Sequence, residues 1–160
     1  MAVDMFIKIG DLKGETKDKD KKDFIDVLAW SWGLSQSGTT HTGGGGGSGK
    51  VSVQDISLTK YVDIASAKLM LACCTGKHFD TAQLIVRKAG EKPLEYIVID
   101  MTEVIISSVS TGGSGGEDRL TENVSLNFAK VKFTYAKQGD KGAKDGGDDM
   151  TYDIAGNASG

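Results

Sequence analysis

The fold is decided by the stretch Leu28-Ala29-Trp30-Ser31-Trp32-Gly33-Leu34, in which large apolar residues take turns with small ones. The large residues occupy the even positions, whereas the odd positions hold Ala29, Ser31 and Gly33. Side chains two residues apart lie on the same face of a strand, so this pattern is typical of a β-strand. We therefore predict one bulky side that faces a core and one small, almost featureless side.

The same alternation recurs over most of the chain and predicts further strands. Their ranges are 3–9, 24–34, 50–61, 81–88, 94–110 and 120–135, with a short last strand at 150–154. In two of them the apolar positions change phase once, which turns every later side chain to the other face. A strand that keeps its core side then needs a bulge, which we expect near Gln54-Asp55 and near Phe128-Ala129.

One segment, from Asp63 to Gly76, predicts a helix. Asp63 or Ser66 can cap its start, Gly76 suits its end, and most residues between them are good helix formers. Many strands with a single helix indicate a mainly β protein, either a β-barrel or a sandwich, with the helix outside.

Composition predicts an ordinary soluble globular protein. The 160 residues suggest one domain, 1–160, with 39% hydrophobic and 26% charged residues. Glycine occurs 22 times and proline once, which predicts Gly-rich loops near residues 37–49 and 111–116 and a mobile segment near 138–149. The net charge of −3 argues against a nucleic-acid partner, because phosphate neutralisation needs a clustered basic surface.

The start of the chain lacks the basic and long apolar segments of a signal peptide, and no apolar run is long enough to span a membrane. We therefore expect synthesis in the cytoplasm, no membrane insertion, and export only by a route without a cleaved leader. Adjacent Cys73 and Cys74 predict reduced, buried thiols, because a bond between neighbours is strained. The charges from Lys17 to Asp23 alternate in sign and predict a solvated loop.

A nucleotide site is the most tempting candidate chemistry. The segment Gly44-Gly45-Gly46-Gly47-Ser48-Gly49-Lys50 matches the G-x-x-x-x-G-K part of a phosphate-binding loop. Such a loop continues with Ser or Thr, which holds magnesium, and then opens a helix whose amides face the phosphate. Here Val51 follows, and Val51-Ser52-Val53 predicts a strand. We therefore expect a structural arm, and no nucleotide or other cofactor.

Metal binding and catalysis lack a matching set of residues as well. The two histidines, His41 and His78, and the two cysteines have neither C-x-x-C nor H-x-x-x-H spacing. Both histidines sit beside loop-like residues, and no acidic residues form a recognisable pair. We expect no metal and no enzyme activity.

Three predicted strands share a side of small, uncharged residues. These residues are Ala29, Ser31, Gly33, Ser52, Gln54, Asn123, Ser125 and Asn127. A face turned to solvent would normally carry Lys and Glu. Their absence predicts a smooth wall that faces a channel or a neighbouring subunit, with an ordinary, partly exposed sheet face as the alternative.

Four segments resemble the haemolysin-coregulated protein family, the tube subunits of type VI secretion systems. They are MAVDMFIKI at residues 1–9, IDVLAWSWG at 25–33, VQD with LTKY within 53–61, and the stretch 107–127 that contains STGGSGGEDRLTENV. Their order and spacing agree with the family as well, and together they span nearly the whole chain to about Tyr135.

The resemblance implies a small β-barrel of two packed antiparallel sheets with one external α-helix, similar to a phage tail tube. It also implies hexameric rings that stack into a tube inside a contractile sheath. Such a tube is expelled from the cell with a spike protein at its tip, and its lumen binds or chaperones small effector proteins.

On this basis we expect lumen-facing positions at Ala29, Ser31, Gly33, Ser125 and Asn127. We expect the loop between subunits or stacked rings at Gly43, Gly44, Gly45, Gly46, Gly47, Ser48 and Gly49. The alternative function is that of a stand-alone secreted binding module or effector.

Overall fold

A computed structural model describes residues 3–38, 50–90, 93–139 and 144–160 of the chain. Within these ranges it holds one helix and eleven strands. In chain order they are β1 (Val3–Ile9), β2 (Ile25–Asp26), β3 (Ala29–Ser31), β4 (Leu34–Gln36), β5 (Val51–Val53), β6 (Ile56–Tyr61), α1 (Ser66–Thr75), β7 (His78–Lys88), β8 (Leu94–Thr111), β9 (Thr121–Gln138), β10 (Lys144–Asp153) and β11 (Ala158–Ser159).

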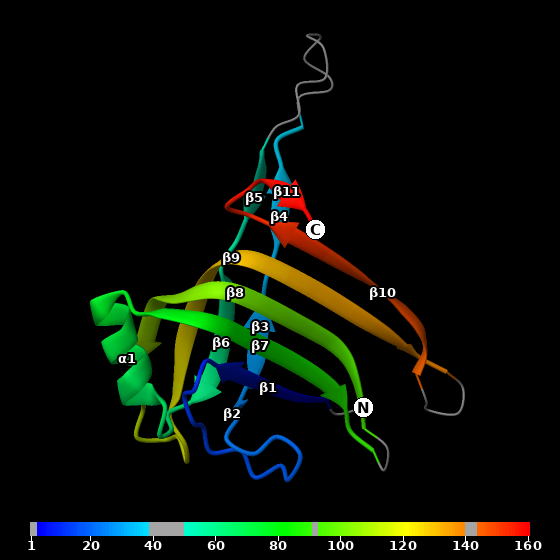
Figure 1. Cartoon of the computed structure of the whole chain (residues 1–160). Coiled ribbons are helices and arrows are strands. Elements are labelled where there is room, and N and C mark those ends of the chain that lie inside the picture. Colours follow the sequence, from blue (N-terminus) through cyan, green and yellow to red (C-terminus); the bar gives the residue numbers. More distant parts are fainter. Residues whose placement is uncertain (1–2, 39–49, 91–92, 140–143) are drawn as a thin grey trace.

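The strands form two antiparallel sheets. The larger sheet has nine strands in the order β11-β10-β9-β8-β7-β1-β2, with β6 also paired to β9 and β3 paired to β6. The smaller sheet is the β4–β5 pair. The large sheet curls round the core like a barrel without closing into one continuous ladder, and α1 lies outside it (Figure 1). The predicted fold class is confirmed.

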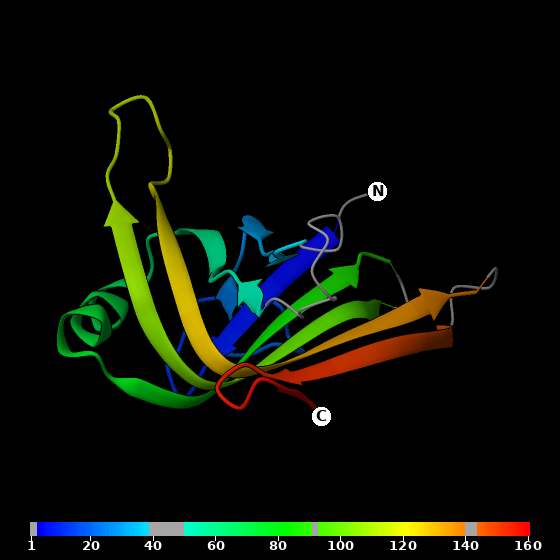
Figure 2. The ribbon, with the colours of Figure 1, turned by 90° about the horizontal axis from the view of Figure 1, so that it is seen from above.

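The strands β8 and β9 are the longest in the described part of the chain, and they connect its different parts. Each has 18 residues, and β9 pairs with β6 near its start and with β10 towards its end. The end of the β8–β9 hairpin projects from the rest of the sheet beside α1 (Figure 2). One end of the β8–β9 pair therefore lies beside α1 (Figure 2), and at the other end β9 pairs with β10.

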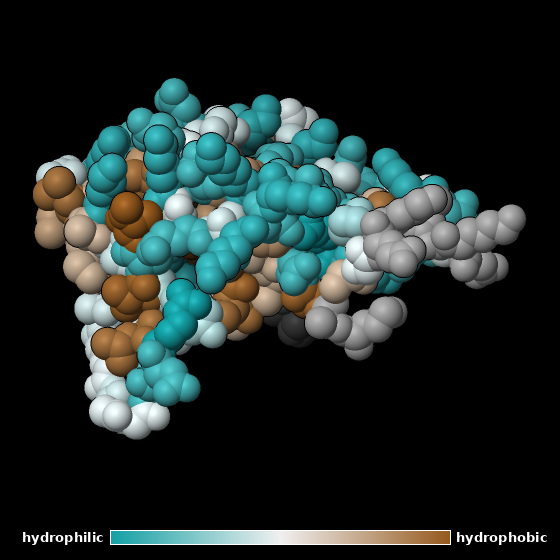
Figure 3. All heavy atoms as spheres, turned by 90° about the horizontal axis from the view of Figure 1, so that it is seen from below, coloured by the Kyte–Doolittle hydropathy of each residue, from teal (hydrophilic) through white to brown (hydrophobic). Residues whose placement is uncertain are grey.

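Several large apolar side chains stay exposed. Ile64 and Leu71, at the start and in the middle of the α1 region, are 64% and 63% exposed, and Val62 and Leu120 are each 42% exposed. The view from below shows apolar residues on the side of the molecule that carries α1 (Figure 3). Exposed apolar surface of this kind often marks a contact with another protein.

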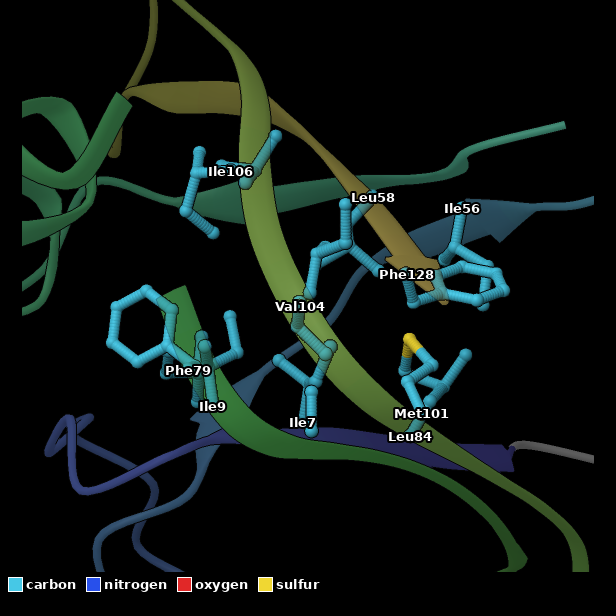
Figure 4. Close-up of a cluster of buried hydrophobic side chains, with 14 of the residues drawn as sticks. Ile7, Ile9, Ile56, Leu58, Phe79, Leu84, Met101, Val104, Ile106 and Phe128 are labelled. Carbon is cyan, nitrogen blue, oxygen red and sulfur yellow. The ribbon is translucent and has the colours of Figure 1, made fainter. Parts of the chain in front are cut away.

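The core lies inside the curl of the large sheet. Buried side chains from β1, β6, β7, β8 and β9 point toward one another, among them Ile7, Leu58, Leu84, Val104 and Phe128 (Figure 4). The helix adds Leu69 and Ala72 to this cluster. Each fully buried Val, Leu, Ile, Phe or Met side chain contributes roughly 1.5–3 kcal/mol when it is removed from water.

The strand predicted over residues 24–34 is divided into β2, β3 and β4. The amide of Val27 donates to the Met5 carbonyl, whereas the amide of Leu28 donates to the Thr59 carbonyl. The chain therefore crosses from β1 to β6 at this point. The crossing makes one part of the prediction wrong, because Leu28 and Leu34 are exposed, at 39% and 47%, instead of facing the core.

The two expected bulges had different outcomes. The bulge near Gln54-Asp55 is confirmed, because the pairing shifts by one residue there, from Leu34 with Val53 to Ser31 with Ser57. The bulge near Phe128-Ala129 is wrong, because the register between β8 and β9 shifts between Ile106 and Ser108, on the partner strand. The buried positions of β9 nevertheless change from even to odd numbers, since Leu126 and Phe128 are buried and so is Val131. Across from that phase change, Glu103 on β8 has a φ of 54°, which bends the strand.

The helix is confirmed. It begins at Ser66, three residues after Asp63, the first residue of the predicted segment. Asp63 Oδ1 accepts a hydrogen bond from the Ala65 amide at 2.9 Å, and Ser66 Oγ accepts one from the Asp63 amide at 2.9 Å. These bonds shape the turn before α1, while Ala65 at the cap position makes no side-chain cap bond. Gly76 ends the helix in the left-handed conformation, at φ 67°.

Three further predictions need correction. The segment 144–149 is part of β10 and not a loop, because it pairs with the end of β9. Cys73 and Cys74 are free thiols, but Cys74 is exposed and Cys73 is only partly buried. The charged run 17–23 is not simply solvated, because Asp18 pairs with Arg87 and Lys21 pairs with Glu95.

Candidate functional site: a small-polar sheet face

The strand registers bring short, uncharged residues, all but one of them polar, from four strands into two rows. The first row is Ala29 on β3, Thr59 on β6, Asn123 on β9 and Ser110 on β8. The second row is Ser31, Ser57, Ser125 and Ser108, in the same strand order. We call these eight residues the polar face.

The other side of the same strands belongs to the core. Trp30, Leu58, Val124 and Val109 form the row between the two polar rows, and Leu58 and Val124 are 1% and 0% exposed. This alternation follows from the period of two along each strand. The core row therefore fixes which way the polar face points.

Two hydrogen bonds cross between strands on the polar face. Thr59 Oγ1 donates to Asn123 Oδ1 at 2.8 Å, and the hydroxyl oxygens of Ser57 and Ser125 lie 3.3 Å apart. These bonds hold short side chains against the sheet. The result is a low surface of hydroxyl, amide and methyl groups, which can donate or accept hydrogen bonds but carries no titratable group.

A carboxylate stands at one end of the polar face. Asp55, in the break between β5 and β6, accepts a hydrogen bond from Asn127 Nδ2 at 2.8 Å and from Ser107 Oγ at 2.6 Å. Asn127 lies two residues beyond Ser125 on β9, and Ser107 is the extra residue of β8. The end of the face is therefore negatively charged, unlike its two rows.

The structure brings four of the five sequence-predicted lumen residues together. Ala29, Ser31 and Ser125 lie on the polar face, and Asn127 lies beside it with Asp55. Gly33 is less open, because its carbonyl accepts the Gln54 amide and an added Cβ would lie 3.1 Å from Gln54 Oε1. That all five line a lumen stays a prediction.

The predicted arm lies outside the described residues. It comprises Gly43, Gly44, Gly45, Gly46, Gly47, Ser48 and Gly49.

Sequence reasoning missed part of the face. Ser57 and Thr59 on β6 join Ser31 to Ser125, and Ser108 and Ser110 extend the face onto β8. The sequence could have indicated Ser57 and Thr59, since both residues alternate with the apolar Ile56 and Leu58. Asp55 had no such signal, because its contacts come from residues more than fifty positions away.

A buried ionic cluster lies where β6 and β9 meet the start of α1. The Lys60 ammonium is 3.1 Å from Glu122 Oε1, 3.0 Å from Asp63 Oδ1 and 2.8 Å from the Tyr61 carbonyl oxygen. Lys60 and Glu122 are 0% and 1% exposed. The cluster ties two strands of the polar face to the helix.

Two further observations concern the chemistry that the described ranges can support. Over these ranges no three His, Cys, Asp or Glu side chains gather closely enough to hold a metal ion. No helix there has the length and apolar character that crossing a bilayer requires.

The sequence and the fold of this chain are similar to those of known proteins. Residues 6–135 match the family described as "Type VI secretion system effector, Hcp". "Protein hcp1" of Pseudomonas aeruginosa is 66% identical over 148 residues, which cover 92% of this chain and 91% of that protein.

Solved structures agree with these matches. The crystal structure of Hcp1 from Salmonella typhimurium is 39% identical with a TM-score of 0.83, over 99% of each chain. A structure described as a type six secretion system protein has a TM-score of 0.93 at 28% identity, over 99% of this chain and 100% of that one.

These matches define a mainly β protein of a type VI secretion system. The chain belongs to the Hcp family, as its sequence segments predicted.

Proposed function

We propose that this chain is the structural subunit of a type VI secretion inner tube. In this proposal six copies form a ring, rings stack inside a contractile sheath, and the tube is expelled behind a spike protein. Small effector proteins bind in the lumen and are protected there. The chain acts by assembly and binding and is not an enzyme.

The observation that carries the proposal is the polar face. Its two rows combine eight short, uncharged side chains from four strands on one side of a curved sheet. Rows that present neither large apolar residues nor fixed charges suit a channel wall that conducts many different proteins. Serine, threonine and asparagine provide hydrogen bonds that can adapt to different partners.

The edges of the large sheet favour a ring. A closed ring uses a head-to-tail interface in which two different surfaces of each subunit meet. In the described part of the chain, the sheet ends at β2 on one side and at β11 on the other, and β3 forms a further edge beside β6. Such edges carry unpaired backbone groups that can pair with a neighbouring chain.

Other surfaces offer contacts for stacking and for the sheath. The exposed apolar residues Ile64 and Leu71 lie just before α1 and within it. The Gly-rich arm, Gly43 to Gly49, is proposed to reach an adjacent subunit or ring. The protein is proposed to be made in the cytoplasm and to leave the cell as part of the expelled tube.

A bulky replacement at Ser31 tests the role of the polar face. Ser31→Trp places a large side chain in the middle of the second row, and we expect it to lower cargo binding at least tenfold, or about 1.4 kcal/mol. Rings should remain intact by light scattering, because Ser31 is exposed and its side chain is outside the core. Cargo binding is measured by co-purification of a small effector protein.

The matched control is Ala89→Trp, a small-to-large change at an exposed position just after β7. It should leave both ring size and cargo binding unchanged. Normal cargo binding by intact Ser31→Trp rings would show that Ser31 does not contact the cargo.

The second candidate function is a stand-alone secreted binding module or effector. It keeps the polar face as a binding surface but needs no ring. Light scattering at working concentration separates the two, because a stable monomer would contradict the tube subunit.

A further inference from the structure

We propose that Asp55 makes the polar face selective for basic segments of the proteins that it contacts. The inference rests on the proposed function, because it names the chemistry of the cargo that the face receives. Asp55 acts as the specificity-determining residue, and its ligand is a Lys or Arg side chain on an extended part of the cargo.

The Asp55 carboxylate is held in a fixed position. Asn127 and Ser107 donate to its two oxygens at 2.8 and 2.6 Å, and the preceding carbonyl, that of Gln54, accepts the Trp32 indole N–H at 2.9 Å. Asp55 is only partly buried. A carboxylate in this setting stays in place at the surface and loses little side-chain freedom when a ligand arrives.

No Lys or Arg among the described residues forms an ion pair with the Asp55 carboxylate. Both hydrogen-bond donors are neutral, and the ion pairs found among the described residues involve Lys21, Lys60 and Arg87 but never Asp55. A carboxylate offers about four acceptor positions, so two donors leave room for a ligand. Charge-assisted hydrogen bonds to Lys or Arg are roughly twice as strong as neutral ones.

The surroundings fit a basic side chain. Asn127 also lines a cavity of about 320 Å³ whose other walls include Glu103, Ile105 and Phe128. Glu103 adds a second negative charge, while the half-buried Ile105 provides apolar surface for the hydrocarbon stem of Lys or Arg. His78, which also lines this cavity, is the other titratable group there.

Within a ring the effect is repeated. Each subunit contributes one Asp55, so an assembled ring carries a circle of carboxylates at one end of otherwise uncharged rows. Charge of one sign in a channel raises the local concentration of oppositely charged segments and speeds their entry. We therefore expect the face to discriminate by charge near Asp55 and to be tolerant elsewhere.

The test uses the full chain and two fluorescent peptides of equal length, one alternating Lys and Ser and one alternating Glu and Ser. Binding is followed by fluorescence anisotropy at low and high salt. The variant is Asp55→Asn, which removes the charge but keeps an acceptor for Asn127 and a group that can pair with Ser107. Asp11→Asn, on the exposed turn after β1, is the matched control.

We expect the natural protein to prefer the Lys peptide, and Asp55→Asn to weaken that binding by about threefold to tenfold, the range for a partly exposed charge pair. The salt dependence should fall with it, and Asp11→Asn should change neither. Equal binding of the Lys peptide by Asp55→Asn and by the natural protein would overturn the proposal.

Light scattering on the same samples separates this inference from the proposed function. Intact rings without a preference for the Lys peptide would overturn the role of Asp55 and leave the tube function standing. A monomer that still shows the Asp55-dependent preference would contradict the tube function and support the role of Asp55.

Discussion

Lys60 shows how a single residue departs from the usual burial rules. Lysine is rarely buried unless it is paired, and here its side chain is 0% exposed between β6, β9 and the start of α1. Its position is consistent with the strand period, since Ile56, Leu58 and Lys60 share the core side. Glu122 and Asp63 provide the opposite charges, at 3.1 and 3.0 Å. The cluster keeps the helix at a fixed place beside the polar face.

Replacing Lys60 tests the contribution of this cluster to stability. Lys60→Met removes the cation and leaves Glu122 buried without its partner, so the free energy of unfolding should fall by about 3–5 kcal/mol. Urea unfolding followed by tryptophan fluorescence measures the change. Adding Glu122→Leu should recover part of the loss, because the stranded charge is then gone as well.

The control for this prediction is Lys68→Met on the exposed side of α1, where the change should stay within about 0.5 kcal/mol. Equal, small effects of Lys60→Met and Lys68→Met would contradict the account of the buried cluster.

At the scale of elements, the loop between β1 and β2 is fastened to the sheet by charged residues. Asp18 binds Arg87, whose guanidinium also lies 3.6 Å from Asp4 and 5.1 Å from the centre of the Phe6 ring. The hydrogen bond from Arg87 lowers the pKa of Asp18, and the same bond to Asp18 raises the pKa of Arg87. The loop is therefore part of the folded structure.

This pairing predicts a pH dependence. Because the folded-state pKa of Asp18 is depressed, its contribution to stability is present above the unfolded-state value, about 4 for Asp, and is lost as the pH falls through the folded-state value. Asp18→Asn should cost about 1 kcal/mol at neutral pH, as for a partly solvent-screened pair. The difference from the natural protein should shrink as the pH falls below about 4.

Unfolding curves over a pH series check this expectation, with Asp20→Asn, on the exposed part of the same loop, as the control. A difference between Asp18→Asn and the natural protein that grew on acidification would contradict the assigned role of Asp18.

Elements also show what the sequence can and cannot predict. Alternation identified nearly every strand, because it reports which side of a strand meets the core. It did not reveal that the chain exchanges partners at Val27 and Leu28, since that depends on β1 and β6 being neighbours in the fold. It also missed the start of β10, because glycine and aspartate disfavour strands unless a partner, here the end of β9, offers pairing.

At the scale of the whole molecule, one curved sheet separates a core side from a polar side. The rows of the polar face combine β3, β6, β9 and β8, which are distant in sequence and adjacent in the fold (Figure 1). The small-polar character of three strands was visible in the sequence, but their assembly into rows needed the registers. The position of Asp55 at the end of the face could be found only from its side-chain hydrogen bonds with Ser107 and Asn127.

The central claim is that this face lines the hole of a ring of six chains. A cryo-electron microscopy reconstruction of the purified protein tests it most directly. We predict a sixfold ring with a central hole, and with Ser31, Ser57, Ser125 and Ser108 on its inner wall. A protein that remained monomeric, or a ring in which these four serines faced outward, would contradict the account.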